Sequence, residues 1–367
     1  MKALKTDIAT SLTLNNNMIT SVFKTSLKEN EKRIPIHPAH IERLDPKIIK
    51  ELIFEKDYGV DYGYSDMQLE TMGCKFATRE ELFNKAGILI LPKPLAADLQ
   101  QMKDGQILCG WTHAVQQRDI ADLAIEKKLT LLAWEEMNHV TSTTKMHTFY
   151  RNNELAGYAG VLHYLQLLGQ DGHYGERKKV VVLGYGSVSK GAIYALQGRG
   201  FNNITVYTQR PKHLVADKNP DVWYKNFKDD DLWEDLYSAH IIFNGVLQDV
   251  NNPLMFIRNE NELAQLKRNA AIIDISCDKD MGFYFAQPTS FKEPLIKLSR
   301  GVQYYSVDHT PTYLWNAASR EISAALVPHL KDIIDPERWE SNSTIINCID
   351  IYNGKIHNQN ITKFQNR

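Results

Sequence analysis

The sequence has little cysteine and no cysteine pair at the spacing that binds a metal. Its four cysteines (Cys74, Cys109, Cys277 and Cys348) lie far apart among 367 residues. Structural zinc sites and small disulfide-stapled folds both use closely spaced cysteines. We therefore expect neither a metal site nor disulfides, and a reducing cytoplasmic location is the simplest expectation.

Long apolar runs and an excess of one charge are also missing. No apolar stretch approaches the roughly 20 residues that a membrane helix needs, and the formal net charge is −1. Basic residues are scattered and form no stripe, so nothing points to a nucleic-acid or membrane surface. With 43% hydrophobic and 24% charged residues, the composition is typical of a globular chain long enough for two domains.

The first 17 residues lack any hydrophobic pattern. They are polar, end in three asparagines and contain no long apolar core of the signal-peptide kind. We interpret residues 1–17 as a disordered extension, or as an artefact of the assigned start, ahead of the first strand.

Short apolar runs recur along the rest of the chain and alternate with helical patterns. They predict one group of strands at 19–23, 52–54, 87–91, 106–109 and 129–134, and a second at 180–183, 204–207, 241–243, 270–275 and 302–307. A long helix at 153–168 separates the groups, and Gly157 and Gly160 inside it indicate close packing. This alternation predicts an α/β fold of two Rossmann-like domains, with doubly wound parallel sheets and a cleft between them.

The strand predicted at 180–183 is followed by glycines at the spacing of a phosphate-binding loop. Gly184 permits a tight turn, and Gly186 lets a pyrophosphate approach the backbone. The helix expected to begin near Ser187 and Val188 offers N–H groups and a partial positive charge to that anion. Because Ser189 occupies the position of the usual third glycine, the motif alone fits an ordinary strand–turn–helix corner equally well.

No carboxylate follows the next strand, where NAD-binding domains place the acid that accepts the ribose hydroxyls. That strand runs instead into Thr208, Arg210 and Lys212. A guanidinium and an ammonium both pair with phosphate oxygens, so we predict NADP(H) as the cofactor. The alternative is that Arg210 and Lys212 are solvated surface charges that discriminate neither cofactor.

A final helical pattern at 314–333 follows the second group of strands and suggests that the chain returns to its first domain. We therefore predict a discontinuous substrate domain, 18–148 with 312–367. The dinucleotide-binding domain would be the inserted segment 149–311.

Polar residues follow three strands of the first group, where an open α/β sheet binds its ligands. They lie in the segment Lys28–Pro35, at Lys93 between two prolines, and in Gly105–His113. Each segment taken alone fits a solvated face, a loop residue or a packed histidine.

Together and in this order, the segments resemble the alanine dehydrogenase/saccharopine dehydrogenase superfamily. The chain has the segment Glu31–Ile34 of the form E-x-R-[IV], the Lys93 strand end, G-Q-I-L before His113, the nucleotide loop, and the strand end Ile273–Asp278. The resemblance covers residues 18 to about 330. It is nearest to the branch that condenses pyruvate with the side-chain amine of ornithine, using NADPH.

The resemblance implies roles for single residues. Arg33 would bind the oxo-acid carboxylate with its guanidinium fork. Lys93 would contact the substrate carbonyl or share proton transfer, and His113 would be the general acid/base. Asp278 would lie near the nicotinamide ribose and the reacting centre, and Glu135 would tune the substrate site.

The resulting expectation is an NADP-dependent oxidoreductase acting on CH–NH bonds. It would condense pyruvate reductively with the side-chain amine of ornithine or lysine, forming N5-(1-carboxyethyl)ornithine from ornithine. The alternatives are alanine dehydrogenase or saccharopine dehydrogenase activity, and a non-catalytic NADP(H)-binding sensor. Expected partners are small-molecule substrates and further copies of the chain in a homo-oligomer, with neither nucleic acid nor membrane.

Two departures from the family pattern bear on the substrate. Lys93-Pro94 stands where alanine dehydrogenases have Lys-Glu-Pro, and Ser189 replaces a glycine. Both argue against plain alanine dehydrogenase activity. The pair Asp308-His309 resembles a family loop near the nicotinamide, and the sequence assigns it no role.

Overall fold

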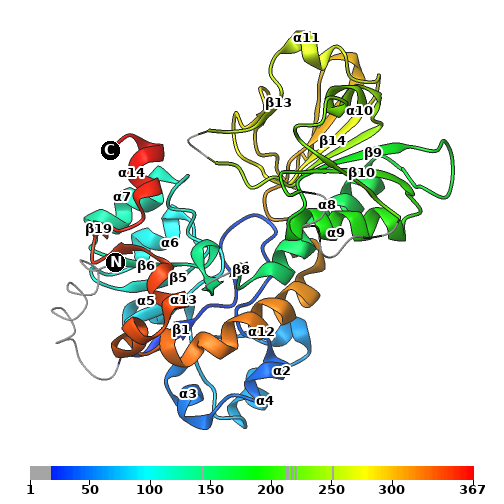
Figure 1. Ribbon diagram of the computed structural model, residues 1–367. Helices are drawn as coiled ribbons and strands as arrows, with labels where there is room; N and C mark the ends of the chain where they lie inside the picture. Colours follow the sequence, from blue (N-terminus) through cyan, green and yellow to red (C-terminus); the bar gives the residue numbers. More distant parts are fainter. Residues whose placement is uncertain (1–17, 142–143, 212–214, 216–218, 220, 250–251) are drawn as a thin grey trace. The chain divides into compact units, whose positions relative to one another are not determined.

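The computed structural model describes residues 18–141, 144–211, 215, 219, 221–249 and 252–367. The predicted extension 1–17 and Lys212 lie outside the described residues. The chain divides into two compact units (Figure 1). Unit 1 comprises the described residues up to Tyr150 together with Trp315–Arg367, and unit 2 comprises Arg151–Leu314.

The described residues of unit 1 form an eight-stranded sheet in the order β19-β18-β6-β5-β4-β1-β2-β3. Neighbouring strands from β1 to β6 are parallel and follow the 3-2-1-4-5-6 order of doubly wound sheets. β18 joins β6 antiparallel, and β19 joins β18 antiparallel. The strands are β1 Thr20–Val22, β2 Leu52–Glu55, β3 Lys75–Ala77, β4 Ile88–Ile90, β5 Ile107–Gly110, β6 Thr130–Ala133, β18 Ile349–Tyr352 and β19 Lys355–Ile356.

Helices cover both faces of this sheet because its central strands are apolar on both sides. Ile88 and Ile90 belong to the core formed with helix α12, whereas Leu89 and Leu91 belong to the core formed with α5, α6 and α7. Successive side chains of a strand point to opposite faces. The helices are α2 Pro38–Ile41, α3 Pro46–Lys50, α4 Asp66–Glu70, α5 Arg79–Lys85, α6 Ala96–Gln101, α7 Arg118–Glu126, α12 Trp315–Ile333, α13 Ser343–Asn347 and α14 Gln359–Gln365.

The described residues of unit 2 form a seven-stranded sheet in the order β11-β10-β9-β12-β14-β17-β16. Again the strands are parallel in the 3-2-1-4-5-6 order, and β16 is added antiparallel at the edge. The strands are β9 Lys179–Leu183, β10 Asn203–Thr208, β11 Trp223–Asn226, β12 Ile241–Asn244, β14 Ala271–Asp274, β16 Leu295–Lys297 and β17 Gln303–Tyr305.

Helices α8 (Tyr150–Leu167) and α9 (Ser187–Gly198) cover one face of the second sheet, and α10 (Leu232–Ser238) and α11 (Glu260–Leu263) cover the other. Glycines bring α8 and α9 close together. A Cβ at Gly157 would overlap the carbonyl oxygen of Val188, and a Cβ at Gly191 would overlap that of Glu154. The glycines therefore permit backbone-to-backbone contact beside the nucleotide loop, and the packing expected at Gly157 is confirmed.

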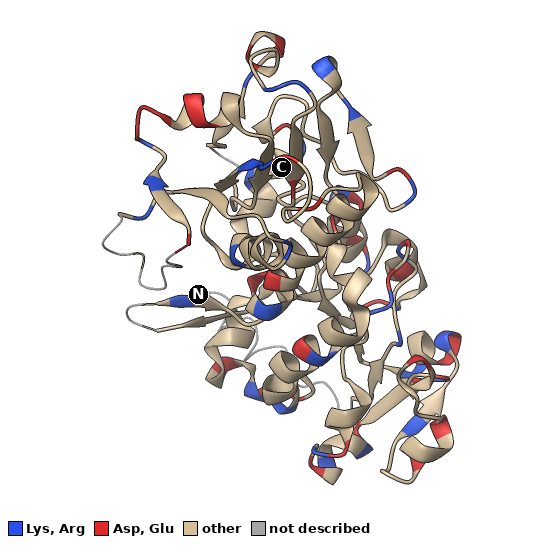
Figure 2. Ribbon diagram, turned by 90° about the vertical axis from the view of Figure 1, so that its right-hand side faces the viewer, with Lys and Arg blue, Asp and Glu red and all other residues tan. Residues whose placement is uncertain are grey.

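The predicted fold class is confirmed: both units are α/β, and every predicted strand of the two groups is present with slightly different ends. The sheets are parallel-rich but mixed, because β16, β18 and β19 are antiparallel. Strands β1, β4, β5 and β6 carry no charged residue. Figure 2 shows charged residues of both signs on helices and loops.

Among the described residues, two short strand pairs lie outside the main sheets. β7 (Asn138–Val140) and β8 (Lys145–His147) pair antiparallel in unit 1, and β13 (Met255–Ile257) pairs with β15 (Gly282–Phe283) in unit 2. In the part of the chain that the structure describes, no helix has the length and apolar character to cross a membrane.

Candidate functional site

Each sheet reverses its winding between the first and fourth strands, between β1 and β4 in unit 1 and between β9 and β12 in unit 2. Ligands of open α/β sheets bind outside the carboxyl ends of the strands at this point. In unit 1, Arg33 follows β1, Lys93 follows β4, His113 follows β5 and Glu135 follows β6. The topology therefore places all four predicted residues beyond the carboxyl ends of the strands in the first sheet. We call this end of each sheet its carboxyl edge.

Arg33 is held in a buried ion pair by Glu31. Its Nε donates to Glu31 Oε1 at 2.8 Å and its Nη2 to Oε2 at 2.5 Å, and Arg33 is only 2% exposed. The guanidinium carbon lies 5.0 Å from the ring centroid of Trp111. A two-point pair stacked on an aromatic ring fixes the plane of the guanidinium.

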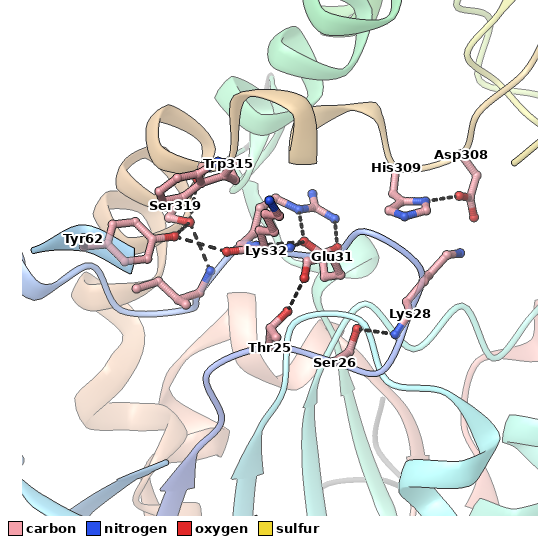
Figure 3. Close-up of polar contacts among 12 residues, drawn as sticks. Thr25, Ser26, Lys28, Glu31, Lys32, Tyr62, Asp308, His309, Trp315 and Ser319 are labelled. Atoms are coloured by element: carbon pink, nitrogen blue, oxygen red, sulfur yellow. Dashed lines mark hydrogen bonds and ion pairs between the residues drawn. The ribbon is translucent and has the colours of Figure 1, made fainter. Parts of the chain in front are cut away.

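The loop that carries Arg33 is fixed by further hydrogen bonds, several of them visible in Figure 3. The Thr25 hydroxyl donates to the carbonyl oxygen of Glu31 at 3.0 Å. The backbone N–H of Ile34 donates to the Ser319 hydroxyl at 3.0 Å, and that hydroxyl lies 2.7 Å from the hydroxyl of Tyr62. Helix α12, which begins at Trp315, thus anchors the far end of the loop.

The loops of Lys93 and His113 touch through their backbones. A Cβ at Gly110 would overlap the carbonyl oxygen of Leu91, so only glycine permits this approach. The N–H of Trp111 donates to the carbonyl oxygen of Pro92 at 2.9 Å. Lys93 is 7% exposed, and the backbone contact just before it fixes the start of its loop against the loop of His113.

His113 takes a left-handed backbone conformation, with φ of +47°. Its backbone N–H donates to Glu135 Oε1 at 2.5 Å, and its Nδ1 lies 4.0 Å from the same oxygen. The imidazole is 32% exposed. Glu135 therefore holds the turn that presents the His113 imidazole.

The Glu135 carboxyl, of which one oxygen is buried, interacts with the buried carboxyl of Asp350, a residue that the sequence did not point to. Burial, and next the charge of Asp350, raise the pKa of Glu135, and burial raises the pKa of Asp350. Asp350 lies on β18 and accepts from Asn358 Nδ2 at 2.8 Å. Neither Glu135 Oε2 nor Asp350 Oδ2 has a hydrogen-bond partner among the described residues.

The glycine loop of unit 2 combines a tight turn with open space. Gly184 has φ of +88°, and a Cβ there would lie 3.1 Å from the carbonyl oxygen of Gly245. Apart from its chain neighbours, no described atom lies within 4 Å of the Cβ position of Gly186. Helix α9 begins at Ser187, so its first N–H groups, including that of Val188, follow this open position. The loop therefore fits a phosphate group.

Ser189, in the place of the third glycine, is completely buried against β12. A Cβ at Gly245 would lie 2.5 Å from the Ser189 hydroxyl oxygen. The glycine that allows close packing of helix and sheet therefore stands on the facing strand end. This compensates for the departure from the usual motif.

The end of β10 presents Thr208 and Arg210 differently. Thr208 is buried, and its hydroxyl accepts from the backbone N–H of Arg210 at 3.2 Å. Arg210 is exposed. The Asn226 amide donates to the carbonyl oxygen of Gln209 at 3.3 Å. The strand end is thus fixed while the Arg210 side chain faces solvent, where it could meet a phosphate.

The end of β14 carries two carboxyls in different environments. Asp274 is fully buried and accepts from Asn244 Nδ2 at 3.0 Å and from the Tyr304 hydroxyl at 2.9 Å. Burial raises its pKa to about 7. Asp278, four residues on, is partly exposed, and burial raises its pKa to about 6. Asn244 and Tyr304 are supporting residues that the sequence did not reveal, because their partner lies on another strand.

The pair without an assigned role, Asp308 and His309, lies in unit 2. His309 Nδ1 and Asp308 Oδ1 are hydrogen-bonded (Figure 3), and the ring of Phe291 packs on His309 at 4.6 Å between centroids. Within the described ranges, no group of three or more His, Cys, Asp or Glu residues is placed to hold a metal ion.

Comparisons with known proteins match both units. The N-terminal domain model of alanine dehydrogenase/PNT matches residues 23–156, and the C-terminal domain model matches residues 172–359. An N(5)-(carboxyethyl)ornithine synthase of Clostridium botulinum is 28% identical over 320 residues, covering 82% of this chain and 90% of the relative. Alanine dehydrogenase 1 of Staphylococcus aureus is 21% identical, covering 94% of this chain and 96% of the relative.

Among solved structures, an L-alanine dehydrogenase has the same fold. It superposes with a TM-score of 0.78 at 17% identity, covering 95% of this chain and 99% of that one. The resemblance predicted from the order of the strand-end motifs is thereby confirmed. Since the two models together match most of its length, the chain belongs to the alanine dehydrogenase/PNT family.

Proposed function

We propose that the protein is a pyridine-nucleotide-dependent dehydrogenase acting on amino acids. Specifically, it would use NADPH to condense pyruvate with the side-chain amine of ornithine or lysine. One observation carries the proposal: Arg33, Lys93 and His113 gather at the carboxyl edge of the first sheet, on loops fixed by buried contacts. The similarity to N(5)-(carboxyethyl)ornithine synthases at 26–28% identity supports the choice of amine.

Unit 2 would be the dinucleotide-binding unit. Gly184, Gly186 and the first turn of α9 fit a pyrophosphate, because the turn is pre-formed and the position over Gly186 is open. Thr208 and Arg210 would receive the adenosine ribose and its 2′-phosphate, and Asp278 the nicotinamide ribose. NADPH, when bound, supplies the hydride that reduces the imine carbon.

Unit 1 would bind and activate the oxo acid. Arg33 orients its carboxylate, with Glu31 fixing the plane of the guanidinium. Lys93 polarises the keto oxygen as the amine attacks. His113 takes the proton that the attacking amine releases and returns one as water leaves, so that the imine forms. Glu135 holds the His113 turn through the backbone N–H.

A second candidate uses ammonia as the amine, as in alanine dehydrogenase. It is favoured by the similarity to alanine dehydrogenase 1 over 94% of this chain. The predicted non-catalytic sensor is a third possibility of another class. The homo-oligomer and the cytoplasmic location stay predictions.

The test is NADPH oxidation with pyruvate and each amine in turn: ornithine, lysine and ammonia. We expect oxidation with pyruvate plus ornithine or lysine, and none when either partner is left out. Substituting NADH should lower the rate. If, of the three amines, only ammonia supported NADPH oxidation with pyruvate, alanine dehydrogenase activity would replace the proposal. If the protein bound NADPH but oxidised it in none of the mixtures, the sensor would be favoured.

A further inference from the structure

Arg79, the first residue of α5, connects loops that follow different strands of unit 1. Its Nη1 donates to the carbonyl oxygen of Thr25 at 2.9 Å and to Glu55 Oε2 at 3.1 Å. Its Nη2 donates to Asp98 Oδ1 at 2.9 Å. One guanidinium thus joins the loop after β1, the end of β2 and the helix that follows β4.

The contact with Thr25 connects Arg79 to the loop that carries Arg33. The Thr25 carbonyl accepts from Arg79, and the Thr25 hydroxyl donates to the carbonyl oxygen of Glu31 at 3.0 Å. The Glu31 carboxylate in turn holds the Arg33 guanidinium. The same loop is fixed once more at its start, because Glu55 Oε2 accepts from the backbone N–H of Lys24 at 2.8 Å.

The contact with Asp98 connects Arg79 to the loop that carries Lys93. Asp98 is completely buried, and its Oδ2 accepts from the backbone N–H of Leu95 at 2.9 Å. Leu95 is two residues after Lys93, with Pro94 between them. Because proline restricts its own backbone and that of the residue before it, fixing Leu95 also restricts where Lys93 can lie.

The geometry needs an arginine. The guanidinium carbon lies 5.0 Å from the ring centroid of Phe23 and 5.7 Å from that of Phe83, while its two terminal nitrogens reach three acceptors. A planar fork can stack on rings and donate sideways at the same time, whereas a lysine ammonium is a compact point charge. Lysine would keep the charge but lose this bridging geometry.

We propose that Arg79 is a positioning residue that sets the separation of Arg33 and Lys93 and so controls recognition of the oxo acid. It acts through the two loops and touches no reacting atom. The proposal rests on the proposed function, in which Arg33 and Lys93 bind the oxo acid. It adds a residue outside the strand-end motifs to the determinants of that binding.

The experiment compares the variants Arg79→Lys and Thr25→Val, with their double variant, in the full-length protein. We expect Arg79→Lys to raise the KM for pyruvate about tenfold, the effect of one charge-assisted hydrogen bond. NADPH affinity, measured by fluorescence titration, should stay within about twofold of wild type. Thr25→Val should raise the KM less, and the double variant should show less than the product of both effects, because both changes act on one connection.

Arg338→Lys is the matched control. Arg338 also belongs to unit 1 and pairs with an aspartate, its Nε donating to Asp332 Oδ1 at 2.6 Å. Among the described residues, its hydrogen bonds reach neither of the two loops. It should leave the KM for pyruvate unchanged.

Three results would overturn the proposal. An unchanged KM in active Arg79→Lys overturns the positioning role alone. An equal loss of pyruvate and NADPH binding marks general loss of structure and overturns it as well. Wild-type protein that oxidises no NADPH with pyruvate and any amine overturns the proposed function and this inference together.

Discussion

Units 1 and 2 share a strand order, but different kinds of residue follow the first strand of each sheet. In unit 2, β9 runs into Gly184 and Gly186 and passes directly into helix α9. In unit 1, β1 runs into a charged loop that reaches Arg33 and is held by side-chain bonds of Thr25 and Glu31. One edge therefore offers backbone N–H groups and space, and the other offers fixed side chains.

The difference shows what a common topology does and does not determine. The strand order sets where a ligand can bind, because both sheets have their switch point at the carboxyl edge. The residues at that edge set what binds there. A glycine loop suits any phosphate of the right size, whereas the Arg33–Glu31 pair suits a planar carboxylate in one orientation. Variants at the two edges should therefore affect different ligands.

The largest expected effect is at the unit 1 edge. Replacing His113 by alanine should lower turnover about 10²–10⁴-fold, the range for loss of a general acid/base. NADPH affinity should change by no more than about twofold. The measurement is steady-state oxidation alongside NADPH fluorescence titration. Full turnover in His113→Ala would remove the imidazole from the proposed chemistry.

A smaller effect, dependent on pH, is expected at the unit 2 edge. Burial raises the pKa of Asp278 to about 6, so its accepting carboxylate form is lost as the pH falls through about 6. Wild-type NADPH affinity should therefore fall about tenfold from about pH 7.5 to about pH 5. Asp278→Asn should bind NADPH about tenfold more weakly than wild type at the higher pH. Its NADPH affinity should also depend less on pH.

The matched control for that profile is Asp280→Asn, an exposed acid on the same loop. It should keep the wild-type pH dependence. If Asp278→Asn kept the wild-type profile instead, another group would be responsible and Asp278 would not contact the cofactor.

The smallest effect concerns cofactor choice. Arg210→Ala should lower the affinity for NADPH about fivefold, since an exposed ion pair contributes about 1 kcal/mol at most. It should leave the affinity for NADH unchanged. Arg199→Ala, at the opposite end of α9 and paired with Asp171 at 2.9 Å, serves as the control. Equal weakening of NADPH and NADH in Arg210→Ala would contradict a 2′-phosphate contact.

Local sequence was sufficient for the parts of the fold that depend on short apolar runs. The buried parallel strands β4 and β9 contain unbroken runs of Val, Ile and Leu, and a glycine bounds each run, Gly87 before β4 and Gly184 after β9. The family was predictable because the order of motifs along the chain carries information that no single motif does. The roles of Arg33, Lys93 and His113 stay predictions, although the structure places their loops at one sheet edge.

The supporting residues could not be predicted, because their partners are distant in sequence. Asp350 lies on β18, which joins β6 antiparallel across more than two hundred residues of sequence, and nothing near it signals burial beside Glu135. Arg79 lies in the segment Thr78–Glu81, whose Thr-x-x-Glu pattern predicts only the capped start of a surface helix. Its three acceptor residues lie on a loop, a strand and a helix that only the folded sheet brings together.

The most direct test of separate roles for the two edges is NADPH titration of a matched pair of variants. Arg33→Met alters the unit 1 edge, and Gly186→Val fills the open position beside α9 in unit 2. We predict that Arg33→Met keeps NADPH affinity within about twofold of wild type, while Gly186→Val weakens it at least about tenfold. The reverse order, or equal losses in both variants, would contradict the division of substrate and cofactor between the two edges.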